Sequence, residues 1–147
     1  MTTTAYLRRP PALRRSWMFV PGMDAAAQAA GLASGTDALV ADLEEFTAPV
    51  ERPAARPRIA ALFATCRAQG VVAAVRINKL EDDGLADLRG VMPGAPDAVF
   101  LPHAESAAQI IALDQAIGAL EAELGLPPRQ HRDRAHAGIR AGAGTRL

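Results

Sequence analysis

The sequence predicts an α/β fold in which four strand–helix units build a parallel sheet. Three observations predict this class: short apolar runs recur four times, a stretch with helical character follows each run, and the runs are apolar at consecutive positions. Strands that are apolar on both faces are typical of parallel sheets covered by helices. Two architectures fit this order, a doubly wound open sheet and part of a (β/α)₈ barrel.

The first two strands are predicted on either side of an Ala-rich helix. Ser16–Pro21 is a short apolar run that the Pro21-Gly22 turn closes. Asp24 can cap the helix that follows, and this helix is expected to end near Gly35. Ala38–Leu43 is the second apolar run. The turn after the first strand matches neither GxGxxG nor a P-loop, so a dinucleotide or P-loop site is only weakly supported.

The third strand is predicted between a long and a short helix. After a loop that contains prolines, a helix ending at Gly70 is indicated by apolar residues at i, i+3, i+4 and i+7, namely Ile59, Leu62, Phe63 and Cys66. Val71–Asn78 is the third apolar run, and Leu85 and Leu88 mark the short helix after it.

The fourth unit has the clearest helix boundaries. Ala98–Pro102 is the fourth apolar run. Ser106 and Gln109 fit a capping box, and Gly125 followed by Pro127 fits a helix stop. Between them, helical spacing is kept by Ile110, Leu113, Ile117, Leu120 and Leu124.

The two ends of the chain differ in composition from the residues between them. Residues 1–15 are rich in Arg and Pro and are expected to form a flexible arm. Residues 129–147 are rich in Arg, Ala, Gly and His, so we expect a disordered tail and no fifth buried strand. The folded domain is therefore predicted to span residues 16–128.

Charge and composition exclude several classes of function. The 16 basic residues balance the 16 acidic ones, which argues against nucleic-acid binding by bulk charge and against a membrane-surface role. No run of apolar residues is long enough to cross a bilayer. The single cysteine, Cys66, excludes an intramolecular disulfide and a cysteine-based metal cluster. A reducing, cytoplasmic compartment is expected.

A Pro-Gly turn and several polar residues stand at the predicted carboxyl ends of the four strands, where parallel α/β domains carry their functional groups. They are Pro21 and Gly22, then Asp42, Glu44 and Glu45, then Arg76 and Asn78, and finally His103. Arginine holds carboxylates bidentately, and carboxylate oxygens suit Mg²⁺, so the set suits an anionic substrate bound with a divalent cation.

Plainer interpretations stay open for several of these residues. Arg76 is costly to bury alone, so it could form a structural ion pair with Glu44 or Asp42. Asn78 fits a turn, and His103 fits a loop without a catalytic role.

The order of four short motifs resembles the HpcH/HpaI aldolase and citrate lyase beta-subunit family. The motifs are RRSWMFVPG, DALVADLEE, VRIN and DAVFLPHAES, and they span about residues 14–128. The resemblance implies a TIM barrel, of which this chain would supply the N-terminal half. It also implies a lyase that makes or breaks a carbon–carbon bond in acyl-CoA thioesters of hydroxy diacids, such as citryl-CoA or malyl-CoA, or in free 2-keto acids.

The resemblance assigns roles to several residues and implies Mg²⁺ as cofactor. Arg76 would steady a developing oxyanion or a substrate carboxylate. Asp42, Glu44 and Glu45 would shape the polar floor of the site, and the Pro21-Gly22 turn would lie near the CoA arm. The family's lysine after strand four is His103 here, which weakens any electrostatic role.

The family's two metal ligands lie in strand-five and strand-six motifs that this sequence lacks, so no residue here is assigned as a ligand. We therefore expect a truncated lyase whose residues from about 129 onward are read out of frame, and which is inactive alone. Open sheet edges predict a homo-oligomer or aggregation. The alternatives are a non-catalytic module that binds a CoA ester or an acidic metabolite, and an unrelated flavodoxin-like binding protein.

Overall fold

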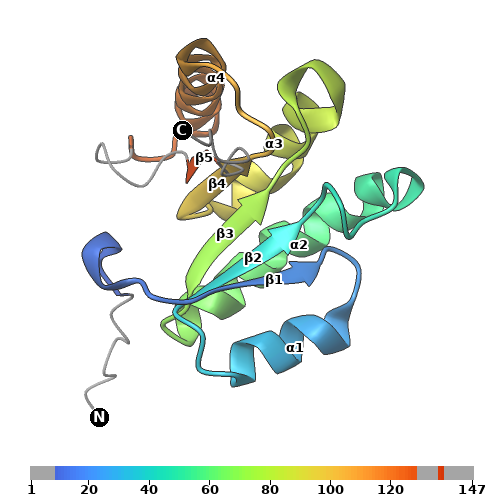
Figure 1. The fold of residues 1–147 in the computed structure, drawn as a ribbon, viewed down its shortest axis with the longest axis vertical. Helices are drawn as coiled ribbons and strands as arrows, with labels where there is room; N and C mark the ends of the chain where they lie inside the picture. Colours follow the sequence, from blue (N-terminus) through green and yellow to red (C-terminus); the bar gives the residue numbers. More distant parts are fainter. Residues whose placement is uncertain (1–8, 129–135, 138–147) are drawn as a thin grey trace, which may run out of the picture.

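The computed structural model describes residues 9–128 and the pair 136–137, and its core is a parallel sheet (Figure 1). The strands are β1 (Trp17–Pro21), β2 (Ala38–Asp42), β3 (Val72–Arg76), β4 (Ala98–Leu101) and the two-residue β5 (His136–Ala137). The helices between and after them are α1 (Ala25–Ala33), α2 (Arg52–Ala68), α3 (Leu85–Val91) and α4 (Ala107–Leu124). The predicted α/β class and its four strand–helix units are confirmed.

Strand order decides between the two predicted architectures. The strands are hydrogen-bonded in the order β1-β2-β3-β4-β5, and every pair is parallel. A doubly wound sheet reverses its strand order at a switch point, whereas each strand of a TIM barrel lies beside the next one in sequence. The sequential order is therefore that of a barrel segment.

One face of this sheet carries the main core. Its largest fully buried side chains come from both strands and helices, with Leu39 and Val75 packing in the same cluster as Ile59, Phe63 and Leu113. Alternate residues of a strand point to opposite faces. The helices therefore cover the face to which Leu39 and Val75 point, and the residues that alternate with them point to the other face.

The opposite face of the sheet holds a smaller apolar cluster. Val40, Ala74 and Ala98 are buried there, with Trp17 and Phe100 packed against them. The rings of Trp17 and Phe100 meet edge to face, with centroids 5.5 Å apart. No helix residue among those described belongs to this cluster. Helices on both faces, as in a doubly wound sheet, are thus not found in the described part of the chain.

Two helix starts show how far local signals predict boundaries. The capping box of α4 is confirmed, because the Ser106 side chain accepts from the Gln109 backbone and the Gln109 side chain accepts from the Ser106 backbone. Helix α2 begins at Arg52, within the stretch expected to be a loop. Pro53 is compatible with this start, because the first turn of a helix leaves its N–H groups unpaired anyway, and Pro57 is accommodated inside the helix.

The ends of the described chain differ in part from expectation. Residues 9–15 were expected in a flexible arm, yet Asp37 accepts a hydrogen bond from the Arg15 backbone at 2.8 Å and pairs with Arg9 Nε at 2.7 Å. The expected arm at residues 1–8 and most of the expected tail lie outside the described residues. Within the tail, β5 pairs with β4, although composition predicts no buried strand there. Pairing at an open edge uses backbone groups, which every sequence supplies.

Every helix in the described part of the chain is too short or too polar to span a bilayer.

Candidate functional site

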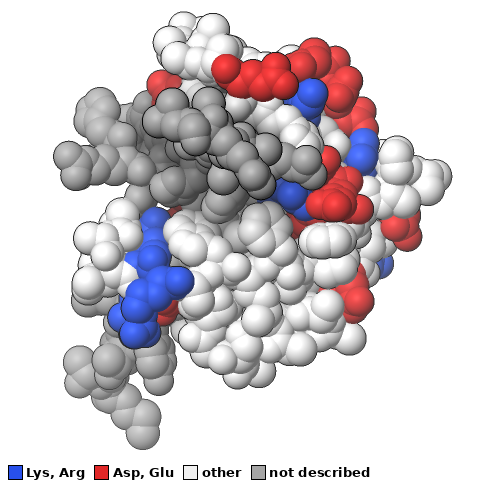
Figure 2. Space-filling model, in the orientation of Figure 1, with Lys and Arg blue, Asp and Glu red and all other residues white. Residues whose placement is uncertain are grey.

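The register of the sheet places an acid directly opposite a base at its carboxyl end. Asp42 is the last residue of β2 and Arg76 the last of β3, and the two are paired in register. Neighbouring strands lie about 4.8 Å apart, so the two side chains are within reach of each other. Figure 2 shows acidic and basic side chains side by side at the edge where the strands end.

Arg76 and Asp42 form a bidentate ion pair. Arg76 Nε donates to Asp42 Oδ1 at 2.7 Å, and its Nη2 donates to Oδ2 at 2.8 Å. The Asp42 side chain is 0 % exposed and that of Arg76 is 19 % exposed. The hydrogen bonds that Arg76 donates to Asp42 raise the pKa of its guanidinium, so this group carries its charge throughout the physiological range.

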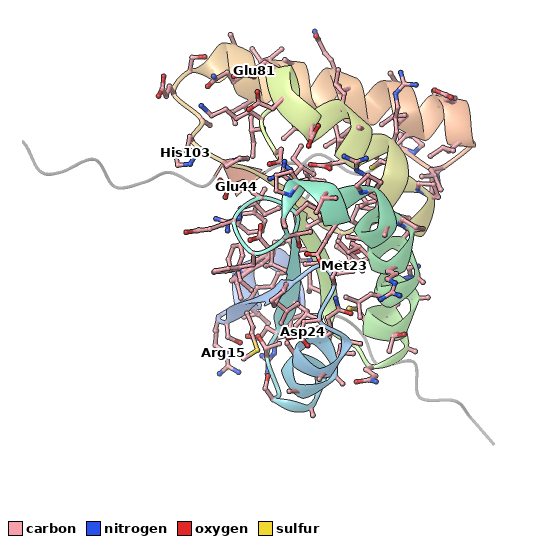
Figure 3. The ribbon with its side chains drawn as sticks, turned by 90° about the vertical axis from the view of Figure 1, so that its right-hand side faces the viewer. Arg15, Met23, Asp24, Glu44, Glu81 and His103 are labelled. Atoms are coloured by element: carbon pink, nitrogen blue, oxygen red, sulfur yellow. The ribbon has the colours of Figure 1, made fainter. Side chains whose placement is uncertain are left out.

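Two further carboxylates face the guanidinium. Glu44 Oε2 lies 3.4 Å from Arg76 Nη1, and Glu45 Oε2 lies 3.3 Å from Nη2. His103, which follows β4, places Nε2 3.9 Å from the other oxygen of Glu44. Figure 3 shows Glu44 and His103 side by side. The ion-pair interpretation of Arg76 named Glu44 or Asp42 as its partner, and the structure pairs it with both.

Two phenylalanine rings flank the same guanidinium. The carbon at its centre lies 5.0 Å from the ring centroid of Phe19 and 5.8 Å from that of Phe46. Both distances suit a cation–π contact. The sequence alone does not reveal this contact, because the position of Phe19 in β1 does not show that Arg76 lies two strands away on the same face.

One edge of the Arg76 guanidinium keeps donors for a ligand. Asp42 takes Nε and Nη2, whereas Nη1 makes no hydrogen bond within the described residues and only faces Glu44. A substrate carboxylate or oxyanion could accept hydrogen bonds from Nη1. The surrounding carboxylates would repel that anion, so the site also needs a positive partner for it.

The described residues do not fit a magnesium ion. Each Asp42 oxygen already accepts two hydrogen bonds, one from Arg76 and one from a backbone amide, of Glu44 for Oδ1 and of Phe46 for Oδ2. Within the described part of the chain, no group of three or more His, Cys, Asp or Glu residues is placed to hold a metal. We therefore derive no reaction step through a metal from these residues.

The Pro21-Gly22 turn is joined to the acidic strand end through a residue that the sequence did not single out. Thr47 Oγ1 accepts from the Gly22 amide at 3.0 Å and donates to the Asp42 carbonyl at 2.6 Å. A β-carbon on Gly22 would lie 2.8 Å from that hydroxyl oxygen, so glycine is required for this close approach. The turn thus borders the cluster through backbone contacts.

Asn78 turns away from the Arg76 cluster. Its side-chain nitrogen donates to the Leu43 carbonyl at 2.9 Å and to Asp87 Oδ2 at 2.8 Å. Asp87 is fully buried and was not identified as a site residue, because its partners are far away in sequence. Asn78 therefore supports the site from behind in this structure.

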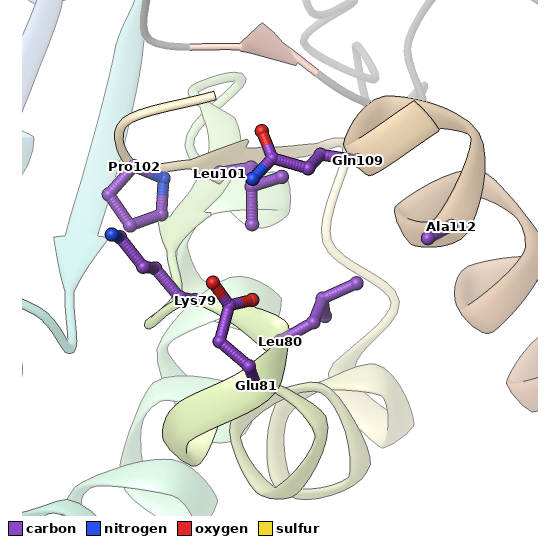
Figure 4. Close-up of a pocket in the computed structure, with 7 residues that line it drawn as sticks. All are labelled: Lys79, Leu80, Glu81, Leu101, Pro102, Gln109 and Ala112. Carbon is purple, nitrogen blue, oxygen red and sulfur yellow. The ribbon is translucent and has the colours of Figure 1, made fainter. Parts of the chain in front are cut away.

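A small pocket lies beside the ends of β3 and β4 (Figure 4). Its volume is about 90 Å³, which is room for about three water molecules. Polar lining comes from Lys79, Glu81 and Gln109, and apolar lining from Leu80, Leu101, Pro102 and Ala112. It is too small to hold an acyl-CoA ester by itself.

Comparison with known proteins identifies the relatives of this chain. The citrate lyase subunit beta of Haemophilus influenzae is 34% identical over 114 residues, which cover 77% of this chain and 39% of the relative. The corresponding subunit of Escherichia coli K12 is 30% identical over 129 residues, 87% of this chain and 43% of the relative. The chain thus spans about two fifths of the length of these curated relatives.

A solved structure shares the fold. It is the protein CitE from Mycobacterium tuberculosis in complex with magnesium and pyruvate, with a TM-score of 0.54 and 34% identity, covering 69% of this chain and 42% of that chain. Residues 15–140 match the sequence model of one family. The chain belongs to the HpcH/HpaI aldolase/citrate lyase family.

Proposed function

We propose that this chain carries the arginine side of the site of a carbon–carbon lyase, and that its substrates are acyl-CoA thioesters of hydroxy diacids of the citryl-CoA or malyl-CoA type. The observation that carries the proposal is the Arg76 guanidinium, which Asp42 holds by one edge, while Nη1 makes no hydrogen bond among the described residues and only faces Glu44 at 3.4 Å. A fixed guanidinium of this kind orients a substrate carboxylate and stabilises an oxyanion as it develops.

The other predicted site residues have distinct proposed roles. Asp42 fixes the plane of the Arg76 guanidinium, and Glu44 and Glu45 form the polar floor in front of it. His103 borders this floor from the end of β4. The Pro21-Gly22 turn lies where the CoA arm would pass, and Asn78 holds the ends of β2 and β3 together.

We propose Mg²⁺ as the cofactor of the complete site, with ligands outside the described residues. The relative with the same fold was solved with magnesium and pyruvate, which supports this choice. When bound, such an ion supplies Lewis-acid chemistry and offsets the carboxylates around Arg76. The chain's own residues would then bind and orient the substrate.

A binding module without turnover is the second candidate. It is favoured because both carboxylate oxygens of Asp42 already accept hydrogen bonds from Arg76 and from backbone amides, so they are not free for a metal or a substrate. In this case Arg76 binds a CoA ester or an acidic metabolite, and no bond is broken.

One experiment distinguishes these functions. The 147-residue chain is incubated with malyl-CoA or citryl-CoA and Mg²⁺, with and without chelator, and both cleavage and binding are measured. Arg76→Met is compared with Arg58→Met, which changes an exposed arginine of α2. Cleavage lost with chelator and in Arg76→Met alone supports the lyase. Binding without cleavage, lost in Arg76→Met, supports the module. If neither cleavage nor Arg76-dependent binding occurs, both proposals are wrong.

We also propose that the chain is cytoplasmic and self-associates. Self-association is supported by the helix-free face of the sheet, where Phe19 remains 38 % exposed. Exposed apolar patches of this kind favour contact with another chain. Sedimentation velocity over a hundredfold range of concentration tests the second point, because a monomer at every concentration would contradict it.

The reading frame of residues 129–147 is a separate proposal. We propose that part of this stretch is translated out of frame, because Arg, Ala, Gly and His replace the apolar strand pattern there, although the family model still matches residues up to 140. Sequencing the gene through the Pro128 codon tests this. An apolar strand pattern in a shifted frame supports it, and its absence from all frames overturns it.

A further inference from the structure

Two arginines of α2 pair with two aspartates that lie just before and within α3. Arg52 Nη1 lies 2.9 Å from Asp83 Oδ2, and Arg56 Nε lies 2.9 Å from Asp87 Oδ1. The arginines are four residues apart, and so are the aspartates. Residues four apart on a helix lie on one side of it, one turn above each other. We call these two parallel ion pairs the Arg–Asp ladder.

The inner pair of the ladder continues to the ends of β2 and β3. Asp87 Oδ2 accepts from both the backbone nitrogen and the side-chain nitrogen of Asn78, at 2.8 Å each. The same Asn78 side-chain nitrogen donates to the Leu43 carbonyl at 2.9 Å. Leu43 follows Asp42 directly, and Asn78 is two residues after Arg76. Asp87 therefore fixes the two chain ends that carry the Asp42–Arg76 pair.

The outer pair reaches the acidic loop of the site. Arg52 Nη2 donates to the Glu44 carbonyl at 3.3 Å, while its Nη1 pairs with Asp83. Arg52 Nε is buried without a hydrogen-bond partner. A buried donor left unpaired is costly. The two Nη contacts hold this arginine in place despite that cost, and they connect the turn before α3 with the loop that carries Glu44.

Two glycines make the close approach of these segments possible. A β-carbon on Gly84 would lie 2.4 Å from the Asn78 carbonyl oxygen, and one on Gly90 would lie 2.5 Å from Arg56 Cβ. Both distances are far below van der Waals contact. The spacing around both ladder pairs therefore depends on glycine in the turn before α3 and on α3 itself.

We propose that the Arg–Asp ladder positions the catalytic end of the sheet, with Asp87 as a positioning residue that sets the orientation of Arg76 without touching substrate. This inference rests on the proposed function insofar as Arg76 binds the substrate carboxylate. The orientation of Arg76 is itself measurable without any substrate. At metal sites, loss of the outer group that orients a ligating residue typically costs about 10- to 100-fold in affinity or activity, and we expect an effect at the lower end of this range for Arg76.

The experiment measures Arg76 directly in the whole chain. Arginine Nε–H signals are recorded by NMR, and Arg76→Lys identifies the signal of Arg76 by its disappearance. Asp87→Asn removes the charge that holds Arg56 and Asn78. Ile117→Ala serves as the matched control, because it destabilises the buried core on α4 and leaves the ladder intact. Pyruvate is then titrated into each variant with Mg²⁺ present.

The expected result is a shifted Arg76 Nε–H signal in Asp87→Asn, with hydrogen exchange at least about tenfold faster, and an unchanged signal in Ile117→Ala. Pyruvate affinity is expected to fall by about tenfold in Asp87→Asn alone. An Arg76 signal that stays unchanged in folded Asp87→Asn overturns the inference, as does an equal change in both variants. Wild-type chain that does not bind pyruvate counts against the proposed function, while the NMR comparison still decides the role of Asp87.

A second variant covers the case in which Asp87→Asn does not fold. Asp83→Asn opens the outer pair, where the aspartate side chain is 46 % exposed and its loss is tolerable. A shift of the Arg76 signal with an affinity loss of about threefold supports the ladder. No shift of that signal in a folded Asp83→Asn chain overturns it.

Discussion

Replacing Arg76 by methionine is expected to destabilise the fold far more than removing either glutamate beside it. Methionine keeps most of the aliphatic length and removes the guanidinium. Asp42 then stays buried as a charge, with only the backbone amides of Glu44 and Phe46 as donors. The consequences for Glu44→Gln and Glu45→Gln are milder, because their side chains remain 25 % and 66 % exposed.

The magnitudes follow from burial. Breaking a buried pair by removing one partner costs about 3–5 kcal/mol. Two amide donors remain on Asp42, so we expect Arg76→Met to cost about 3 kcal/mol, at the lower end of this range. Exposed ion pairs contribute about 0.2–1 kcal/mol, so Glu45→Gln is expected to cost at most about 0.5 kcal/mol and Glu44→Gln about 0.5–1 kcal/mol.

Urea unfolding followed by circular dichroism measures these differences. A double-mutant cycle between Arg76 and Asp42 is expected to give a coupling energy of about 2 kcal/mol, and one between Arg76 and Glu45 at most about 0.5 kcal/mol. For a chain of this length, the loss in Arg76→Met corresponds to a fall in Tm of about 10 °C. Equal coupling energies in the two cycles would refute the reasoning, because they would mean that burial does not separate Asp42 from Glu45.

Three further predictions concern residues away from this pair. Burial raises the pKa of the Cys66 thiol to about 11, so a thiol reagent at pH 8 should modify it at least about 100-fold faster in 6 M urea than in buffer; similar rates would show that Cys66 is accessible in the fold. The hydrogen bond from the Arg15 backbone lowers the pKa of Asp37 below 3.8, so its stabilising contribution is present above that pH and is lost as the pH falls through the lowered value. The urea midpoints of wild type and Asp37→Asn should therefore differ at pH 6 and converge toward pH 2, and a constant difference would contradict this. Gly118→Ala should stabilise the chain by about 0.5–1 kcal/mol, because nothing lies within 4 Å of the new β-carbon inside α4; Gly94→Ala should destabilise it by about 1–3 kcal/mol, because its β-carbon would lie 2.5 Å from the Ala60 carbonyl oxygen, and the two urea midpoints test the opposite signs.

The strands were predictable from sequence because their signal is local. Ala38–Asp42 is buried at every position, so an apolar run marks it on both faces. The start of α2 was missed because Pro53 and Pro57 look like loop residues. Pro53 lies in the first turn, where a proline gives up no hydrogen bond, whereas Pro57 lies inside the helix and removes one. The pairing of β5 with β4 was not predicted, because pairing at the edge of a sheet uses backbone groups and depends little on the side chains.

The site was predictable only as a list of strand ends. Parallel topology brings Asp42 and Arg76 to one edge, and the sequence shows both residues directly after apolar runs. The sequence does not show which partner each polar residue contacts in the folded chain. Asn78 pairs with Asp87 behind the sheet, and Arg56 reaches the same aspartate from 31 residues away. Such contacts depend on how the helices pack, which cannot be predicted from a short sequence motif.

Alternate residues of a strand point to opposite faces of the sheet, which explains why the contacts of Arg76 and the Arg–Asp ladder lie on separate faces and are still linked through the backbone. Asp42 and Arg76 point to the helix-free face, where Phe19 and any substrate would meet them. The residue directly after β2, Leu43, points into the helix-covered core and offers its carbonyl to Asn78. One step along the chain thus passes from the binding face to the Arg–Asp ladder. Under the proposed function, a change in α2 or α3 is therefore expected to tilt the guanidinium through the backbone alone.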